Sequence, residues 1–133
     1  MMIYNTLPAD RAQVKQMNPV VLAFVGDAVY TLYVRTALAL SSGCKAGELN
    51  RRASEVVSAH GQSETLTRIL PLLTEEESEI YHRGRNAKKQ TKSKNATAAE
   101  YVRSTGLEAV VGYLYLTGQT ERIQTLFFQE AQS

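Results

Sequence analysis

The longest apolar stretch of the chain runs from residue 18 to residue 40, with the sequence NPVVLAFVGDAVYTLYVRTALAL. Asn18 can accept hydrogen bonds from the first free amides of a helix, and the fixed φ of Pro19 suits the first helical turn. Beyond Pro19, apolar residues fall on nearly every side of a helix, which is typical of a helix in the centre of a domain. The pattern therefore predicts a central helix over residues 19–40, closed near Gly43.

Six further stretches show helical periodicity, and turn or capping residues separate them. Thr74 and Glu77 form a capping box, so a helix should begin at Glu75. Residues 83–95 are polar and basic without apolar periodicity, which favours a loop or a frayed helix end. No alternation of apolar and polar residues is long enough for a strand, so the fold should be all-α. The other predicted helices cover residues 7–17 with Thr6 as cap, 45–59, 63–70, 98–116 and 121–128.

The length of 133 residues suits one domain with a core of several helices, and we expect a single domain over residues 1–133. Cys44 is the only cysteine, so no intramolecular disulfide can form and a reducing compartment is expected. The N-terminus lacks a basic start followed by a long apolar run, and we expect no segment of membrane-spanning length. These observations predict a cytoplasmic protein without a membrane partner.

The net charge of +2 hides an uneven distribution of charge. Six basic residues and no acid lie between His82 and Ala99, so the rest of the chain has a net charge of −4 (+2 minus 6). Such a segment is either a solvated loop or a surface that binds phosphates. If the segment binds the phosphates of a nucleic acid such as RNA, the residues that we consider as contacts are Arg83, Arg85, Asn86, Lys88, Lys89, Lys92 and Lys94.

Asp27 and Glu108 each interrupt an apolar helix, and each has a glycine nearby. Gly26 adjoins Asp27, and Gly112 follows Glu108 by four residues on the same helical face. Two such helices can cross closely and bring their carboxylates together. Buried like charges need a compensating cation, which suggests an oxygen-liganded metal such as Mg²⁺. Equally, the two acids could cap helices or pair with Arg35, Arg103 or Arg122.

A hard metal ion beside a basic segment suits the hydrolysis of a phosphodiester. Cationic side chains hold the phosphates, while the metal activates water and stabilises the leaving oxygen. The residues alone are compatible with this chemistry, and they are also compatible with capping or ion-paired acids in a protein with a solvated basic loop.

The motifs around the two acids resemble the ribonuclease III family. LAFVGDAVY is similar to the first signature of that family, whose core reads EFLGDA, and LEAVVGYLYLTG is similar to its second acidic segment, DxxEAxxGAIY. The resemblance is strongest to Mini-ribonuclease III, the short bacterial branch without a double-stranded-RNA-binding domain. RGRNAK and residues 95–116 also resemble that branch, so the similarity covers nearly the whole chain.

The resemblance implies the helical ribonuclease III endonuclease fold, a two-fold homodimer and Mg²⁺-dependent cleavage of double-stranded RNA to 5′-phosphate and 3′-hydroxyl ends. By position, Asp27 matches the acid of the first motif and Glu108 the glutamate of the second, so both are expected to be catalytic and to bind the metal. It further suggests that the substrate is the 23S ribosomal RNA precursor, with a ribosomal protein as a further partner.

Two positions depart from the wider family. Ala23 stands where a glutamate precedes the first Asp by four residues, and Thr105 stands where an aspartate precedes the second Glu by three. Fewer anionic ligands should bind a dication more weakly, so the number of metal ions is open. The alternative function is a catalytically inactive RNA-binding or ribosome-assembly module that has kept the fold.

Overall fold

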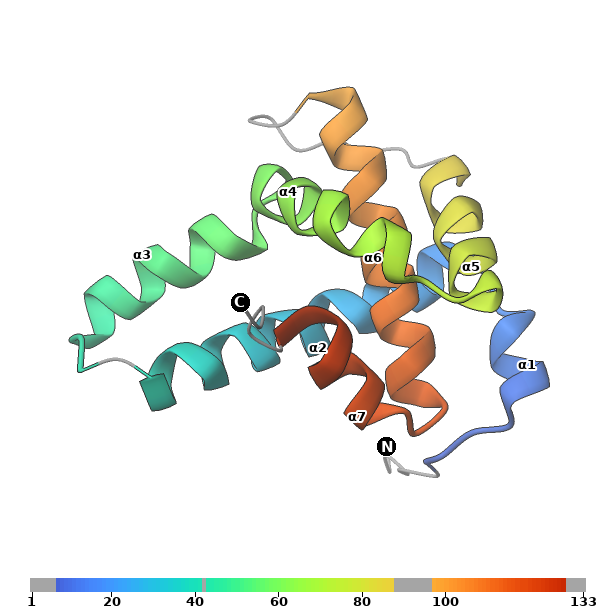
Figure 1. The fold of residues 1–133 in the computed structure, drawn as a ribbon, viewed down its shortest axis with the longest axis horizontal. Coiled ribbons are helices and arrows are strands. Elements are labelled where there is room, and N and C mark those ends of the chain that lie inside the picture. Colours follow the sequence, from blue (N-terminus) through green and yellow to red (C-terminus); the bar gives the residue numbers. More distant parts are fainter. Residues whose placement is uncertain (1–6, 42, 88–96, 129–133) are drawn as a thin grey trace, which may run out of the picture.

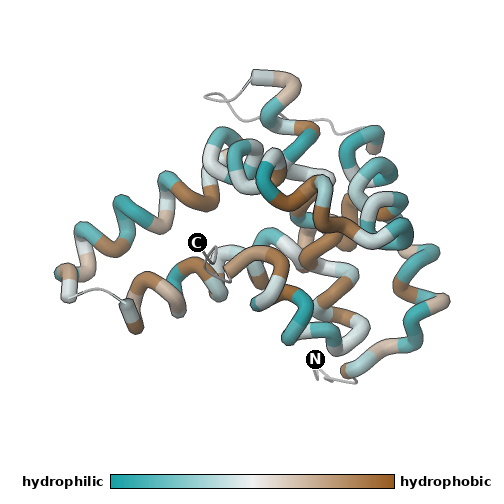
Figure 2. Tube along the Cα trace, in the orientation of Figure 1, coloured by the Kyte–Doolittle hydropathy of each residue, from teal (hydrophilic) through white to brown (hydrophobic). Residues whose placement is uncertain are grey.

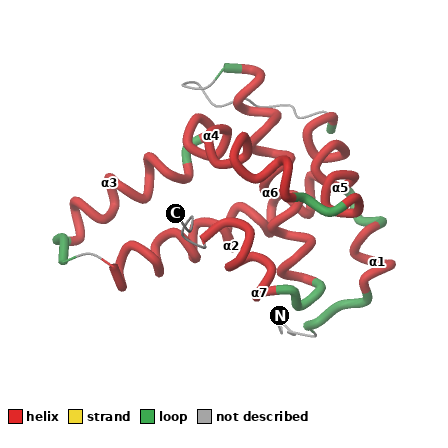
Figure 3. Tube along the Cα trace, viewed as in Figure 1, coloured by secondary structure: helices red, strands yellow, loops and turns green. Residues whose placement is uncertain are grey.

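The computed structural model describes residues 7–41, 43–87 and 97–128, and every regular element in them is helical (Figures 1 and 3). The prediction of an all-α fold is therefore confirmed. The described residues form seven α-helices, with the 3₁₀ turn η1 (Leu70–Leu72) between the fourth and fifth and the π-helical turn η2 (Gln124–Phe128) after the seventh. The α-helices are α1 (Arg11–Lys15), α2 (Pro19–Ser41), α3 (Ala46–Val57), α4 (Ala59–Ile69), α5 (Glu75–Asn86), α6 (Ala98–Leu116) and α7 (Thr120–Ile123).

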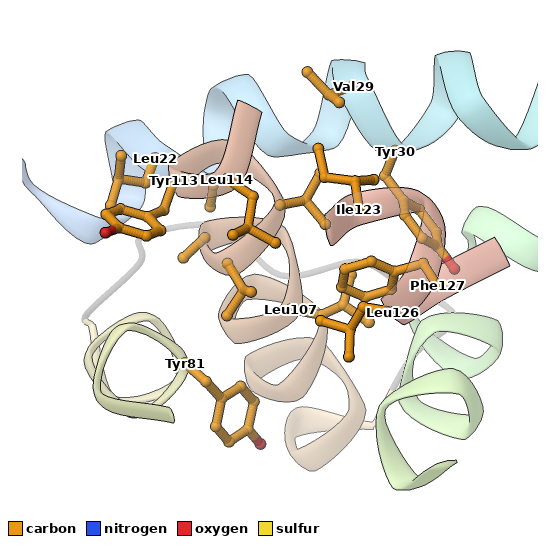
Figure 4. Close-up of a cluster of buried hydrophobic side chains, with 14 of the residues drawn as sticks. Leu22, Val29, Tyr30, Tyr81, Leu107, Tyr113, Leu114, Ile123, Leu126 and Phe127 are labelled. Carbon is orange, nitrogen blue, oxygen red and sulfur yellow. The ribbon is translucent and has the colours of Figure 1, made fainter. Parts of the chain in front are cut away.

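Helix α6 forms the centre of the fold, with α2, α4 and α5 packed around it (Figure 1). Nearly all of its residues from Ser104 to Leu114 are buried, which is what an all-round apolar helix requires. Side chains from α2, α5, α7 and η2 complete the core around Leu107 and Leu114 (Figure 4). The predicted span of residues 98–116 is confirmed.

The crossing of α2 and α6 is a contact between backbones at two glycines. A Cβ atom on Gly26 would lie 1.7 Å from the carbonyl oxygen of Glu108, and one on Gly112 would lie 2.0 Å from that of Leu22. No side chain larger than hydrogen fits at either position. The predicted close crossing of two glycine-bearing helices is therefore confirmed.

A second glycine crossing, between α5 and α6, was not predicted. A Cβ atom on Gly84 would lie 2.9 Å from the Cβ of Ala109 and 3.0 Å from the Cα of Gly106. This contact explains why α5 continues to Asn86, although residues 83–95 were expected to form a loop or a frayed end. Packing against α6 stabilises the last helical turn where apolar periodicity gives no signal.

The break between α3 and α4 lies at Ser58, earlier than the predicted break near His60 and Gly61. The Ser58 side chain caps α4 by accepting a hydrogen bond from the Gly61 amide at 3.0 Å. Gly61 lies in the first turn of α4, where a Cβ atom would be 2.3 Å from the carbonyl oxygen of Glu55. The glycine therefore permits close packing at the break and does not end the helix.

Other helix ends follow capping chemistry. The capping box of Thr74 and Glu77 is confirmed, and Thr97 with Glu100 forms a second one at the start of α6. Helix α1 begins at Arg11 with Asp10 as its N-cap, later than the predicted residue 7. The predicted cap, Thr6, lies outside the described residues. The predicted helix over residues 121–128 appears as α7 followed by η2.

Helix α2 ends one residue later than predicted, but its length and hydropathy bear on the expectation that no segment could span a membrane. Its 23 residues have a mean hydropathy of 1.4 in the most apolar window, enough by length and composition to span a membrane. The expectation that no segment reaches that length was wrong. One face of α2 packs on α6, as in core helices of globular proteins, although only 33% of that window is buried.

Candidate active site

The glycine crossing brings together the segments of α2 and α6 that carry the two predicted acids. Asp27 directly follows Gly26, and the backbone of Gly26 contacts that of Glu108. Glu108 is half-buried, whereas Asp27 is exposed. The expectation of a buried Asp27 was therefore wrong, because Asp27 lies at the edge of the α2 face that packs on α6. An exposed carboxylate needs no internal partner and can bind a ligand from solvent.

Gln62 of α4, which the sequence analysis missed, contacts the second acid directly. Its Nε2 donates hydrogen bonds to Glu108 Oε2 at 3.2 Å and to the Val57 carbonyl oxygen at 2.9 Å. The side chain is only 2% exposed. A sequence signal exists, since Gln62 lies four and seven residues before Leu66 and Ile69, on the buried face of α4.

Tyr30 adds a polar group to the same region of the core. Burial raises the pKa of the Tyr30 hydroxyl above its ordinary value, and the negative charge of Glu108 adds to the rise. A hydrogen bond with Thr65 and the positive charge of Arg68 lower this pKa, but by less than burial raises it. The Tyr30 hydroxyl is therefore protonated at neutral pH. Glu108 therefore acts electrostatically on a protonated hydroxyl from α2 and accepts a hydrogen bond from an amide of α4.

The two positions that lack the family carboxylates are both buried. Ala23 is 1% exposed and Thr105 is 3% exposed. The hydroxyls of Ser104 and Thr105 both donate to the carbonyl oxygen of Tyr101, at 2.7 and 3.1 Å. Both hydroxyls are therefore used in hydrogen bonds to a backbone carbonyl of their own helix, which supports a packing role for both residues.

The alternative partners proposed for the acids are mostly engaged elsewhere. Arg103 donates to the side chains of Ser63 and Thr67, and Arg122 forms an ion pair with Glu77 at 2.8 Å. Arg35 is exposed and lines the same surface hollow as Asp27, together with Phe24, Leu32 and Tyr115. Within the described part of the chain, no group of three or more His, Cys, Asp or Glu residues is placed to hold a metal ion.

Three of the predicted RNA contacts lie at the end of α5. The Arg83 guanidinium donates to the carbonyl oxygens of Lys15 and Met17, at 2.5 and 3.0 Å, and so holds the end of α1. Arg85 lies over the ring of Tyr81, with 5.9 Å from the guanidinium carbon to the ring centroid, and donates to Asn86. All three predicted residues are exposed. Lys88, Lys89, Lys92 and Lys94 lie outside the described residues.

A histidine links α4 to the first turn of α6. His60 Nδ1 lies 2.5 Å from Glu100 Oε2, and His60 Nε2 lies 2.9 Å from Glu64 Oε1. A neutral imidazole can donate from only one nitrogen, so both contacts are satisfied only by the imidazolium. Hydrogen bonding to Glu100 accordingly raises the pKa of His60, and hydrogen bonding to His60 lowers the pKa of Glu100.

We expect this histidine link to stabilise the fold most at mildly acidic pH. The raised pKa of His60 gives stability that is complete below its ordinary pKa of 6.5 and is lost as the pH rises through the folded-state pKa. The lowered pKa of Glu100 gives stability that is present above its ordinary pKa of 4.5 and is lost as the pH falls through the folded-state pKa. In thermal melts, His60→Asn should therefore lower the melting temperature slightly near pH 6 and hardly at all near pH 8.5.

The matched control is His82→Asn, which removes the other histidine of the chain. Because the His60 cluster is exposed, high salt should abolish the effect of His60→Asn near pH 6. A loss of stability that is the same at both pH values would contradict the role of the imidazolium.

Known proteins that are similar to this chain belong to one family, and the matched region includes both acids. Residues 20–119 match the family model of the Ribonuclease III domain. The chain is 41% identical to Mini-ribonuclease 3 of Thermoanaerobacter sp. over 92% of this chain and 86% of that protein. It is 45% identical to Mini-ribonuclease 3 of Streptococcus pneumoniae, over 85% of this chain and 90% of that protein.

A solved structure is similar to most of this arrangement of helices. The crystal structure of a protein from Fusobacterium nucleatum superposes with a TM-score of 0.77 at 32% sequence identity, covering 86% of this chain and 92% of that chain. The matched residues 20–119 include both acids and both glycines of the α2–α6 crossing. The chain therefore belongs to the ribonuclease III family and is an endoribonuclease.

Proposed function

We propose that this enzyme cleaves double-stranded RNA with Mg²⁺ and that Asp27 and Glu108 bind the metal. The observation that carries the proposal is the backbone contact at Gly26, which places an exposed and a half-buried carboxylate on adjoining helices. Carboxylate oxygens are hard ligands, and these residues fit Mg²⁺, which keeps several waters and takes few protein ligands. When bound, Mg²⁺ activates water and stabilises the leaving oxygen.

In this proposal, side chains of the protein hold the metal-binding carboxylates in position and contact the phosphates of the RNA. Asp27 and Glu108 hold their carboxylates on rigid helices, and Gln62 binds one oxygen of Glu108. Arg85 and Asn86 lie exposed at the end of α5, directly before the lysine-rich segment, where they are suited to phosphate oxygens. The protein is proposed to act as a single catalytic domain, so these contacts must come from its own surface.

A cleavage assay on end-labelled double-stranded RNA tests the proposal. With Mg²⁺, we expect cuts on both strands that leave 5′-phosphate and 3′-hydroxyl ends, and with a chelator we expect binding without cleavage. Binding should weaken steeply as the salt concentration rises, because phosphate contacts release counterions. Binding of RNA without any cleavage in Mg²⁺ would favour the inactive RNA-binding module that the absent carboxylates at Ala23 and Thr105 suggest.

We also propose that the enzyme is a two-fold homodimer joined along α2. The face of α2 opposite α6 exposes the large apolar side chains of Val21 (44% exposed), Phe24 (80%) and Leu32 (60%). Brown segments along α2 in Figure 2 mark its hydrophobic residues. A second copy would remove these side chains from water. Two sites related by a two-fold axis can also address both strands of a duplex, which one site cannot easily do.

Phe24→Glu should convert the dimer to a monomer in light scattering coupled to size-exclusion chromatography. A charge at the centre of the apolar face would have to be desolvated in the dimer, at a cost of several kcal/mol. Leu72→Glu is the matched control, because Leu72 is an exposed apolar residue (55%) on η1, away from α2. A dimer that survives Phe24→Glu would contradict the proposed seam.

The natural substrate is proposed to be the 23S ribosomal RNA precursor in the cytoplasm, with a ribosomal protein on that precursor as a further partner. The resemblance to Mini-ribonuclease III supports this proposal. Sequencing of 23S ends from a strain without this protein tests it, since the proposal requires unprocessed ends to accumulate.

A further inference from the structure

Gln62 is the buried side chain that links the second acid to a different helix. It lies in the first half of α4, is 2% exposed, and reaches Glu108 across 46 residues of sequence. The same Nε2 that donates to Glu108 also donates to the carbonyl oxygen of Val57, the last residue of α3. The amide therefore joins the end of α3, the start of α4 and the middle of α6.

The chemistry of its partners fixes the orientation of the Gln62 amide. A backbone carbonyl and a carboxylate accept hydrogen bonds, so the NH₂ group must face them and the oxygen must point away. Both N–H bonds are then used. Gln62 Oε1 is buried and has no hydrogen-bond partner among the described residues. An apolar side chain would avoid the cost of burying that oxygen, so stability alone does not account for a glutamine here.

Glu108 is the group that gains from this arrangement. Its carboxylate is half-buried at the end of a side chain with several rotatable bonds, so a hydrogen bond to one oxygen restricts its orientation. The hydrogen bond holds Oε2 against α4 and so orients the carboxylate. Groups that take part in catalysis or metal binding must be held within about 0.5 Å of their working positions.

We propose that Gln62 is a positioning residue, which holds the Glu108 carboxylate in the orientation needed to bind the catalytic cation. The proposal rests on the proposed function of Glu108 as a metal ligand. Residues that orient a metal ligand typically contribute about 10- to 100-fold to metal affinity or activity. Gln62 should contribute on this scale without touching the cation or the RNA.

The test uses the full chain with Gln62→Met, which keeps the size of the side chain and removes both hydrogen bonds. Gln62→Asn is the second variant, because it is one methylene shorter and should fold even if the methionine is not tolerated. Ser58→Ala is the matched control. It removes the cap of α4 at the same junction, and so lowers stability without a direct contact to Glu108.

Manganese supplies a measurement that does not depend on activity. In NMR spectra of the wild type, Mn²⁺ should selectively broaden the amide signals near Asp27 and Glu108. For Gln62→Met and Gln62→Asn, the Mn²⁺ concentration that gives half-maximal broadening should rise by about 10-fold or more. The kcat of RNA cleavage should fall by about 10- to 100-fold. RNA affinity in chelator should be unchanged, and Ser58→Ala should behave as wild type in both assays.

The outcomes separate this inference from the function on which it rests. If the wild type shows no selective broadening, or broadening that persists in Asp27→Asn, the proposed metal site fails. If the metal site is present but both Gln62 variants match Ser58→Ala in Mn²⁺ dependence and kcat, Gln62 is only structural and the inference is overturned.

Discussion

Replacing Asp27 by Asn or Glu108 by Gln should abolish cleavage of double-stranded RNA while the protein stays folded and still binds RNA. Each change removes one negative charge and keeps the shape of the side chain. Asp27 is exposed, and the backbone contact at Gly26 involves the carbonyl group of Glu108 and not its side chain. We expect cleavage to fall by a factor of about 1,000 or more, equivalent to about 4 kcal/mol of transition-state stabilisation.

The assay compares single-turnover cleavage with RNA binding in chelator, so that a loss of chemistry is distinguished from a loss of affinity. Glu121→Gln is the matched control, because Glu121 is an exposed acid on α7. Wild-type cleavage by Asp27→Asn would remove Asp27 from the active site and would require a different pair of ligands.

Adding a single methyl group at Gly26 of α2 or at Gly112 of α6 should destabilise the fold far more than the same change at Gly47 of α3. The new Cβ would overlap the carbonyl oxygen of Glu108 or of Leu22, and these backbone atoms cannot move without separating α2 from α6. We expect a loss of about 3 kcal/mol or more, a large part of the stability of a typical domain. Urea unfolding followed by circular dichroism measures it.

Gly47→Ala provides the control for the same chemical change. Gly47 lies within α3, and nothing comes within 4 Å of a Cβ atom built on it. Because alanine favours a helix over glycine by about 1 kcal/mol, Gly47→Ala should stabilise the protein or leave it unchanged. Equal effects at Gly26 and Gly47 would show that the backbone contact between α2 and α6 is not as close as the structure has it.

Local patterns predicted the elements and the crossing that organise the site. Apolar periodicity gave the spans of α2 and α6, and a glycine beside each acid indicated that the two helices approach closely. These predictions succeeded because each depends on a local property: a periodicity, a cap, or a side chain too small to hold two backbones apart.

Predictions failed where a property depends on which face of a helix the chain itself covers. Helix α2 is apolar all round, which suggested a buried Asp27, but the described residues leave the side of α2 that carries Asp27 exposed. Gln62 was missed because a polar residue at a buried position is not recognised from apolar periodicity. The contact of Gly84 with Gly106 was missed because no apolar pattern marks it. The roles of the lysines between residues 88 and 94 stay predictions.

The order of residues along α2 couples three properties of the molecule. Within four consecutive residues the helix presents an exposed aromatic ring at Phe24, a backbone contact with α6 at Gly26 and a carboxylate at Asp27. A helix is stiff over one turn, so the contact at Gly26 fixes the positions of Phe24 and Asp27 relative to α6 together. The proposed dimer seam therefore adjoins the proposed metal ligand within one turn of the same helix.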